Sequence, residues 1–206
     1  MKPRQFFDSA RAAFFDTLAE TWDVHTPPPP EELAQYIAKV VAIGPDDYVL
    51  DVGTGTGRMI HYILQYSPRQ IIACDISKKM LERAKAKFGN NPTIITLCAD
   101  AHNLPLEDNS VDVIICHGVF PHFTDRNAAL RELFRVSRRG TRLVISHFGG
   151  REFVNQVHST SPSPLIRGDL LPPAEEAAKQ VTSAGFTVVR IEDTERLYMV
   201  LAVNQG

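Results

Sequence analysis

The stretch "VLDVGTGTGR", residues 49–58, places an acid and three alternate glycines directly after a short apolar run. Such a loop lets the backbone approach a ligand, and the dinucleotide pattern G-x-G-x-x-G uses its last glycine to open a helix N-terminus to a pyrophosphate. Here Arg58 stands where that last glycine is required. Asp51 repels a pyrophosphate but attracts a cationic amine or sulfonium. The loop therefore predicts a ligand with positive charge rather than a dinucleotide.

Four histidines are candidates for proton transfer, because imidazole accepts a proton near neutral pH. They are His117, His122 in "VFPHF", His147 and His158 in "REFVNQVHS", and we expect the fold to point all four toward the site. Three of them also have a structural interpretation: His117 contributes only backbone, His122 caps or packs, and His147 points away from the site. A metal cluster of His122, His147 and His158 is a further alternative, although we expect no metal.

Short apolar runs alternate with helical patterns through most of the chain. The runs at 48–51, 71–74, 93–98, 111–116 and 143–146 predict strands buried on both faces, separated by helices at 58–66, 77–88 and 125–137. Ser77 is the expected N-cap of the second helix. A Pro/Ser-rich insert at 151–172, a helix at 174–184 and strands at 186–191 and 197–203 follow. This alternation predicts an α/β fold with a parallel sheet, in which ligands bind beyond the carboxyl ends of the strands.

The N-terminal segment differs in composition from the rest. Residues 1–26 are predicted to form a helical cap or lid, with aromatic residues at Phe6, Phe7, Phe14, Phe15 and Trp22. Four prolines at 27–30 predict a stiff linker, because they favour extended polyproline geometry. Residues 31–206 are then the main domain, with the insert at 151–172 on the substrate side.

Composition restricts the class of protein. A chain of 206 residues with 44% hydrophobic and 22% charged content buries one core without disulfides. The net charge of -2 gives no reason to expect a nucleic acid partner. No apolar run reaches the roughly 20 residues of a membrane span, and no signal peptide is evident, so we expect a cytoplasmic protein. Cys74, Cys98 and Cys116 lack C-x-x-C spacing and are expected to be buried free thiols.

The sequence "DVGTGTG" at 51–57 resembles motif I of the class I S-adenosylmethionine-dependent methyltransferases. The resemblance extends through "IIACDIS" at 71–77, "LCADAHNLPLEDNSVDVIICHGVFPHF" at 97–123 and "ALRELFRVSRRGTRLVIS" at 129–146. It implies that Asp75 holds the ribose hydroxyls, that Asp100 and the Ala101 amide meet the adenine, and that Trp22 covers the methionine moiety. The cofactor-binding set implied in this way comprises Trp22, Asp51, Gly53, Thr54, Gly55, Gly57, Asp75, Ile76, Met80, Asp100, Ala101, Cys116 and His117.

The same resemblance implies the fold and the reaction. The fold is a Rossmann-like three-layer sandwich with a seven-stranded, mostly parallel sheet in the order 3-2-1-4-5-7-6 and an antiparallel last strand. The reaction is in-line transfer of a methyl group to a small-molecule acceptor, leaving S-adenosylhomocysteine. The narrower likeness is to menaquinone and ubiquinone methyltransferases. One departure is the turn Arg138-Arg139-Gly140-Thr141, where the family usually has Lys-Pro-Gly-Gly.

Several alternatives stay open at this point. Residues 116–119 read Cys-His-Gly-Val, not the Asn/Asp/Ser-Pro-Pro-aromatic motif of enzymes that methylate nucleobase amines, so that substrate class is not expected. A catalytically silent S-adenosylmethionine sensor or subunit, and an NAD-dependent oxidoreductase, are the competing functions. The sequence does not predict the acceptor, its nucleophilic atom or the oligomeric state.

Overall fold

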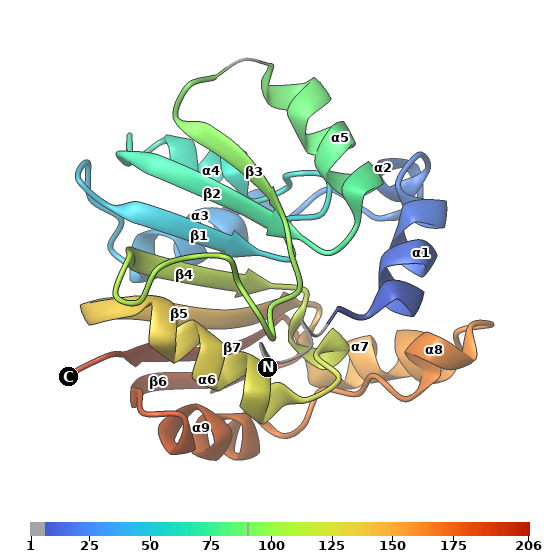
Figure 1. The fold of residues 1–206 in the computed structure, drawn as a ribbon. Coiled ribbons are helices and arrows are strands. Elements are labelled where there is room, and N and C mark those ends of the chain that lie inside the picture. Colours follow the sequence, from blue (N-terminus) through green and yellow to red (C-terminus); the bar gives the residue numbers. More distant parts are fainter. Residues whose placement is uncertain (1–6, 90) are drawn as a thin grey trace, which may run out of the picture.

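A computed structural model describes residues 7–89 and 91–206, which form a seven-stranded sheet with helices on both faces (Figure 1). The strand order is β3-β2-β1-β4-β5-β7-β6. Neighbouring strands from β3 to β5 are parallel, whereas β7 runs antiparallel to both β5 and β6. The predicted fold class, strand order and antiparallel last strand are therefore confirmed. The strands are β1 (Tyr48–Val52), β2 (Gln70–Asp75), β3 (Ile94–Cys98), β4 (Val111–His117), β5 (Ser137–Phe148), β6 (Thr187–Asp193) and β7 (Leu197–Val203).

Two apolar clusters fill the space between the sheet and its helices. On one face Leu130 and Leu133 of α6 (Arg126–Val136) and Val181 of α9 (Ala174–Ser183) are buried against the sheet. On the other face α3 (Glu31–Val40) and α4 (Ile60–Leu64) supply Ile37 and Ile60. Burial of this kind is the main favourable contribution to folding. The sheet is thus the middle layer of a three-layer sandwich.

Side-chain caps fix where the helices begin. Ser77 accepts a hydrogen bond from the Met80 N–H at the start of α5 (Lys78–Phe88), which confirms the predicted N-cap. Asp125 accepts from the Ala128 N–H at the start of α6. The helix predicted at 58–66 is shorter and spans Ile60–Leu64, because the turn that contains the left-handed Gly57 (φ +82°) continues through residue 59.

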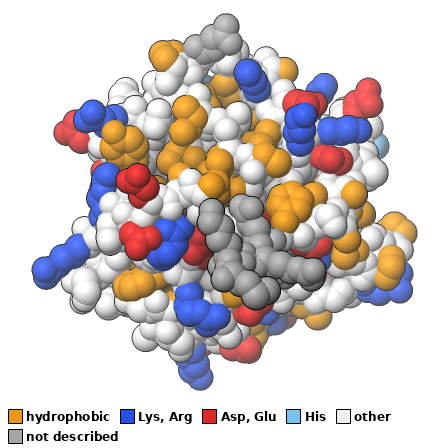
Figure 2. Space-filling model, in the orientation of Figure 1, with side chains coloured by type: hydrophobic (Ala, Val, Ile, Leu, Met, Phe, Trp, Pro, Cys, Tyr) orange, Lys and Arg blue, Asp and Glu red, His pale blue; other side chains and the backbone are white. Residues whose placement is uncertain are grey.

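Strand β3 corrects the prediction that the first five strands are all buried on both faces. Most positions of β3 and β6 are exposed or half-buried, because each strand has a neighbour on one side only. Ile95 of β3 is 42% exposed, and Figure 2 shows hydrophobic side chains gathered near the middle of one face, between the positions of α5 and α6. Cys98 at the end of β3 is likewise exposed, whereas Cys74 and Cys116 are the buried free thiols that were expected.

The segments outside the alternating core carry short helices. The region predicted as a Pro/Ser-rich insert holds α7 (Gly150–Ser159) and α8 (Pro164–Arg167), because prolines occur only after residue 161 and leave an amphipathic stretch before them. At the N-terminus α1 (Ser9–Leu18) and α2 (Trp22–His25) precede the non-helical prolines 27–30. Phe6 of the predicted aromatic face lies outside the described residues. No helix in the described part of the chain is long and apolar enough to cross a membrane.

Candidate functional site

The strand order reverses between β1 and β4, and a pocket opens beyond the carboxyl ends of these strands. Such a reversal leaves a crevice in which α/β proteins bind ligands. The loops that follow β1, β2, β3 and β4 all line the pocket, together with α1 and the 3-10 turn η1 (Phe120–His122). The sheet therefore brings segments that are far apart in the sequence to one site.

The glycine loop after β1 is shaped by backbone conformations that L side chains rarely adopt. Gly53 has φ +68°, and a Cβ there would come within 2.5 Å of the Val119 side chain. Gly55 has φ +55°, and a Cβ there would meet nothing within 4 Å, so its face is open. Gly57 instead faces Phe88 of α5 at 2.7 Å and serves helix packing. The first two glycines thus border the pocket, and the third does not.

Two buried carboxylates stand at the ends of the strands beside this loop. Asp75 accepts hydrogen bonds of 2.8 Å from the N–H groups of Gly55 and Ser77. Burial raises the pKa of Asp75 to about 6, against the opposing effect of these two N–H groups. Burial also raises the pKa of Asp51 to about 7; the Thr54 hydroxyl opposes this rise, and the nearby Asp75 charge adds to it. A cationic ligand would relieve the cost of holding these charges out of water.

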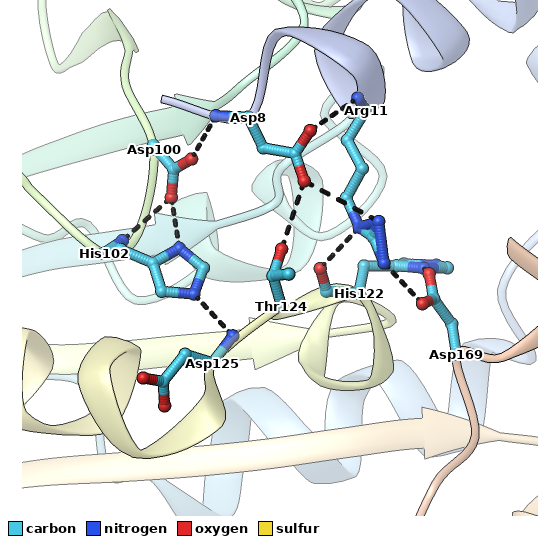
Figure 3. Close-up of polar contacts among 8 residues, drawn as sticks. All are labelled: Asp8, Arg11, Asp100, His102, His122, Thr124, Asp125 and Asp169. Carbon is cyan, nitrogen blue, oxygen red and sulfur yellow. Dashed lines mark hydrogen bonds and ion pairs between the residues drawn. The ribbon is translucent and has the colours of Figure 1, made fainter. Parts of the chain in front are cut away.

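Asp100 follows β3 and is held from two sides (Figure 3). Its Oδ1 lies 2.5 Å from Nδ1 of His102, and its Oδ2 accepts from the Asp8 N–H at 2.9 Å. Because the Asp125 N–H donates to Nε2 of His102, the Nδ1 atom carries the proton and donates to Asp100. Burial raises the pKa of Asp100, but the hydrogen bonds from His102 outweigh it and leave the pKa below its usual value.

The pocket brings together most of the residues expected to bind the cofactor. Those that line it are Trp22, Gly53, Gly55, Asp75, Ile76, Met80, Asp100 and Ala101. Five others are not among the lining residues: Asp51, Thr54, Gly57, Cys116 and His117. Asp51 and Thr54 are both buried, and the Thr54 hydroxyl donates a hydrogen bond of 2.6 Å to the Asp51 carboxylate. Cys116 points into the apolar core, where burial raises the pKa of its thiol well above the usual range.

The N-terminal segment contributes residues that the sequence analysis did not assign to the site. Asp8, Arg11 and Phe15 line the pocket with Trp22. The Phe15 ring lies 6.2 Å from Trp22 and 5.1 Å from His122, edge to face in both cases. His102, Val119, Phe123 and Thr124 also line it and were missed. The dense aromatic pattern was the one feature of the sequence that could have predicted a role for the α1 residues in the pocket. A polar residue such as Arg11 belongs to no such pattern.

Of the four candidate histidines, only His122 lines the pocket. The expectation that all four point toward the site is therefore wrong. His117 hydrogen-bonds the Ser146 hydroxyl at 3.0 Å and lies against Phe148, and burial lowers its pKa to about 3. His147 is half-buried; its Nε2 atom is buried and, within the described residues, has no hydrogen-bond partner. His158 donates through Nδ1 to the Asp169 carbonyl.

The His122 side chain is held in one orientation. Its Nδ1 lies 2.7 Å from Oδ2 of Asp169, and since a carboxylate only accepts, this nitrogen carries the proton. Nε2 then keeps its lone pair. Among the residues the structure describes, Nε2 has no hydrogen-bond partner. This atom is also not fully buried. Burial lowers the pKa of His122; the Asp169 carboxylate opposes this, and His158 and Arg11 add to it. The His122 imidazole at the pocket is thus neutral at pH 7.

Comparison with known proteins identifies the family. The family described as "Methyltransferase domain" matches residues 50–145, which span the glycine loop and the loops after β2, β3 and β4. The chain is 28% identical over 195 residues to an uncharacterised methyltransferase of Schizosaccharomyces pombe, covering 89% of this chain and 76% of that one. It is 39% identical over 107 residues to a demethylmenaquinone methyltransferase of Thermotoga maritima, covering 52% and 45%. The chain is a class I S-adenosylmethionine-dependent methyltransferase.

The structural comparison agrees with this assignment at the level of fold. A methyltransferase from Aquifex aeolicus, described as dependent on S-adenosylmethionine, superposes with a TM-score of 0.68 at 22% identity, covering 97% of this chain and all of the other. The similarity to the Thermotoga relative covers less than half of that protein's length.

The pocket fits S-adenosylmethionine, the cofactor of this methyltransferase. Asp75 offers carboxylate oxygens at the wall of the pocket, as a vicinal diol requires. The open face at Gly55 leaves room for the ligand beside them. Two further buried acids, Asp51 and Asp100, favour a ligand with positive charge.

Asp51→Asn is expected to weaken binding of S-adenosylmethionine by roughly threefold to tenfold and to leave S-adenosylhomocysteine binding nearly unchanged, because only the former carries a sulfonium. It is also expected to stabilise the ligand-free protein. Folding raises the pKa of Asp51 from 3.8 to about 7, so this group favours the folded state fully below pH 4 and loses that contribution as the pH rises through 7.

Titration calorimetry with both ligands and melting curves at pH 4 and 8.5 test this expectation. The variant should melt higher than the wild type by roughly 5 °C at pH 8.5 and show little gain at pH 4. The exposed Asp46, at the opposite end of β1, gives the matched control Asp46→Asn. Equal weakening of both ligands would show that the Asp51 charge does not act on the sulfonium.

Proposed function

We propose that this methyltransferase transfers a methyl group from S-adenosylmethionine to a small-molecule acceptor by in-line displacement, with His122 accepting the proton of the acceptor's nucleophile. One observation carries the proposal: His122, with a free Nε2, lines the same pocket as Asp75 and the glycine loop. The similarity to a demethylmenaquinone methyltransferase also supports a small acceptor. The pocket walls near His122 are apolar and aromatic, with Phe15, Val119 and Phe123.

We assign the remaining site residues by their chemistry. Asp75 accepts hydrogen bonds from the ribose hydroxyls, and Asp100 accepts one from the adenine amino group on a lone pair not used by His102 or Asp8. Trp22 lies over the sulfonium as a cation-π partner. Residues 1–26 form the lid, residues 27–30 the linker and residues 31–206 the catalytic domain. In this arrangement the lid excludes water from the reacting atoms.

Methyl transfer requires near-attack geometry more than elaborate catalysis. The bound cofactor supplies a methyl group on a cationic sulfur. His122 Nε2 takes the proton from the acceptor X–H. X forms a bond to the methyl carbon while the carbon–sulfur bond breaks, and the electron pair of the carbon–sulfur bond stays on sulfur. The products are X–CH₃, neutral S-adenosylhomocysteine and protonated His122, which then releases its proton to solvent. A base with a lowered pKa is neutral at pH 7 and ready for this step.

Two experiments test the proposal. Titration calorimetry should show micromolar binding of S-adenosylhomocysteine and no binding of NAD. Transfer of a labelled methyl group should then be found with members of a panel of thiols, phenols, quinols and amines. Binding of NAD alone would favour the oxidoreductase. Tight S-adenosylhomocysteine binding without transfer to any small acceptor would favour the sensor.

A further inference from the structure

The Asp169 carboxylate connects His122 to α1 (Figure 3). Its Oδ2 accepts from Nδ1 of His122, and its Oδ1 accepts from Nη2 of Arg11 at 2.5 Å. Arg11 also donates through Nε to the His122 carbonyl at 2.9 Å. Arg11 and Asp169 are both more than 90% buried, so this ion pair is screened little by water. One carboxylate therefore serves a histidine of the pocket and a cation of the N-terminal segment at once.

The backbone around Asp169 is fixed independently of these side-chain contacts. His158 of α7 holds the Asp169 carbonyl, and Asn155 of the same helix bonds both the N–H and the carbonyl of Leu171. Arg126 of α6 donates to the Leu170 carbonyl. A carboxylate on so constrained a segment is preorganised to hold its partners. Its remaining freedom is rotation of the side chain.

Arg11 limits that rotation, and it does so only while α1 lies against the pocket. Other contacts dock the same helix: Asp16 accepts from the Ser77 hydroxyl at 2.6 Å, and the Asp8 carboxylate accepts from Thr124 at 3.1 Å. With Arg11 on Oδ1, Oδ2 stays directed at His122. Without Arg11, the carboxylate loses its second partner and His122 loses the bond to its own carbonyl.

We infer that Asp169 is the positioning residue that fixes the proton of His122 on Nδ1, and that Arg11 makes this positioning depend on the docking of α1. The inference rests on the proposed role of His122. It explains why a buried ion pair joins α1 to a segment 158 residues away. It also assigns a task to the 164–171 segment, namely to complete the base rather than only to enclose the acceptor.

Asp169→Asn tests the positioning role. An asparagine has one acceptor oxygen and cannot serve both Arg11 and His122, so kcat is expected to fall by roughly 10- to 100-fold with little change in S-adenosylhomocysteine affinity. The acid limb of the pH–rate profile is expected to move to lower pH, because the negative charge that raises the pKa of His122 is gone. The other groups near His122, namely Arg11, His147 and His158, are unchanged in this variant.

A double-mutant cycle tests the link to α1. Arg11→Gln alone should lower kcat at saturating cofactor by roughly 10-fold, whereas in the Asp169→Asn background it should have almost no further effect. Arg126→Gln is the matched control, because it loosens the same segment at Leu170 without touching the carboxylate. It should leave the acid limb in place.

The outcomes separate this inference from the proposed function. If His122→Gln is impaired but Asp169→Asn shows the pH profile of Arg126→Gln, the positioning role is overturned and the base remains. If the Arg11 and Asp169 effects multiply, the dependence on α1 is overturned. If His122→Gln itself keeps full activity, the proposed base fails, and this inference fails with it.

Discussion

Asp75→Ala is expected to weaken S-adenosylhomocysteine binding by at least about 100-fold, which corresponds to about 2.7 kcal/mol. Hydrogen bonds to a charged acceptor contribute about 1.5 to 3 kcal/mol each, and the ribose diol makes two of them in the proposed complex. The substitution also frees the Gly55 N–H, which Asp75 holds at 2.8 Å. Both effects weaken binding of the same ligand, so we expect a larger loss of affinity than from a substitution at any neighbouring residue. Titration calorimetry measures it directly.

The charge-neutral variant Asp75→Asn separates binding from folding. Folding raises the pKa of Asp75 from 3.8 to about 6, so its contribution to stability is complete below pH 4 and is lost as the pH rises through 6. The ligand-free Asp75→Asn protein should therefore lose less stability than the wild type between pH 4 and pH 8. Asp46→Ala, on an exposed acid, should change neither property. An Asp75 variant that is folded and binds the cofactor as tightly as the wild type would disprove the assignment.

The fold was predictable because local signals and the global arrangement agree. Apolar runs alternate with helical patterns, and the Ser77 cap fixes one helix start directly from the sequence. The strand order came from the family resemblance rather than from the pattern. Burial at the sheet edges was mispredicted, because an edge strand such as β3 has the same apolar composition as a central one. Exposure depends on neighbours that a single run of residues does not reveal.

The site was predictable only where one short segment carries it. Gly55 and Asp75 each belong to a short stretch that carries the family resemblance, and both line the pocket. The histidines show the limit of this reasoning: His117 and His122 are five residues apart, yet only His122 lines the pocket. His117 is the last residue of β4, so the direction of its side chain is set by the alternation of side chains along the strand. His122 lies in η1, which turns its side chain toward α1. Arg11 and Asp169 are joined across 158 residues, and no local pattern connects them.

His122→Gln is expected to lower kcat by roughly 100- to 1,000-fold for an acceptor that must lose a proton, with S-adenosylhomocysteine affinity changed less than twofold. Glutamine keeps a polar side chain of similar reach but has no basic nitrogen, so the effect reports proton transfer rather than packing. Initial rates with the acceptor found in the labelled-methyl screen measure it, and the exposed His61→Gln on α4 is the control.

The pH–rate profile gives the same prediction a second measurement. The wild type should lose activity only below pH 6.5, because burial lowers the pKa of His122. In His122→Gln that acid limb should disappear, and the residual rate should rise with pH as the acceptor ionises in solution. An acceptor that is already anionic at pH 7 should be methylated almost equally by both proteins, because no proton has to be removed. A large loss with that acceptor as well would mean that His122 shapes the pocket instead of acting as the base.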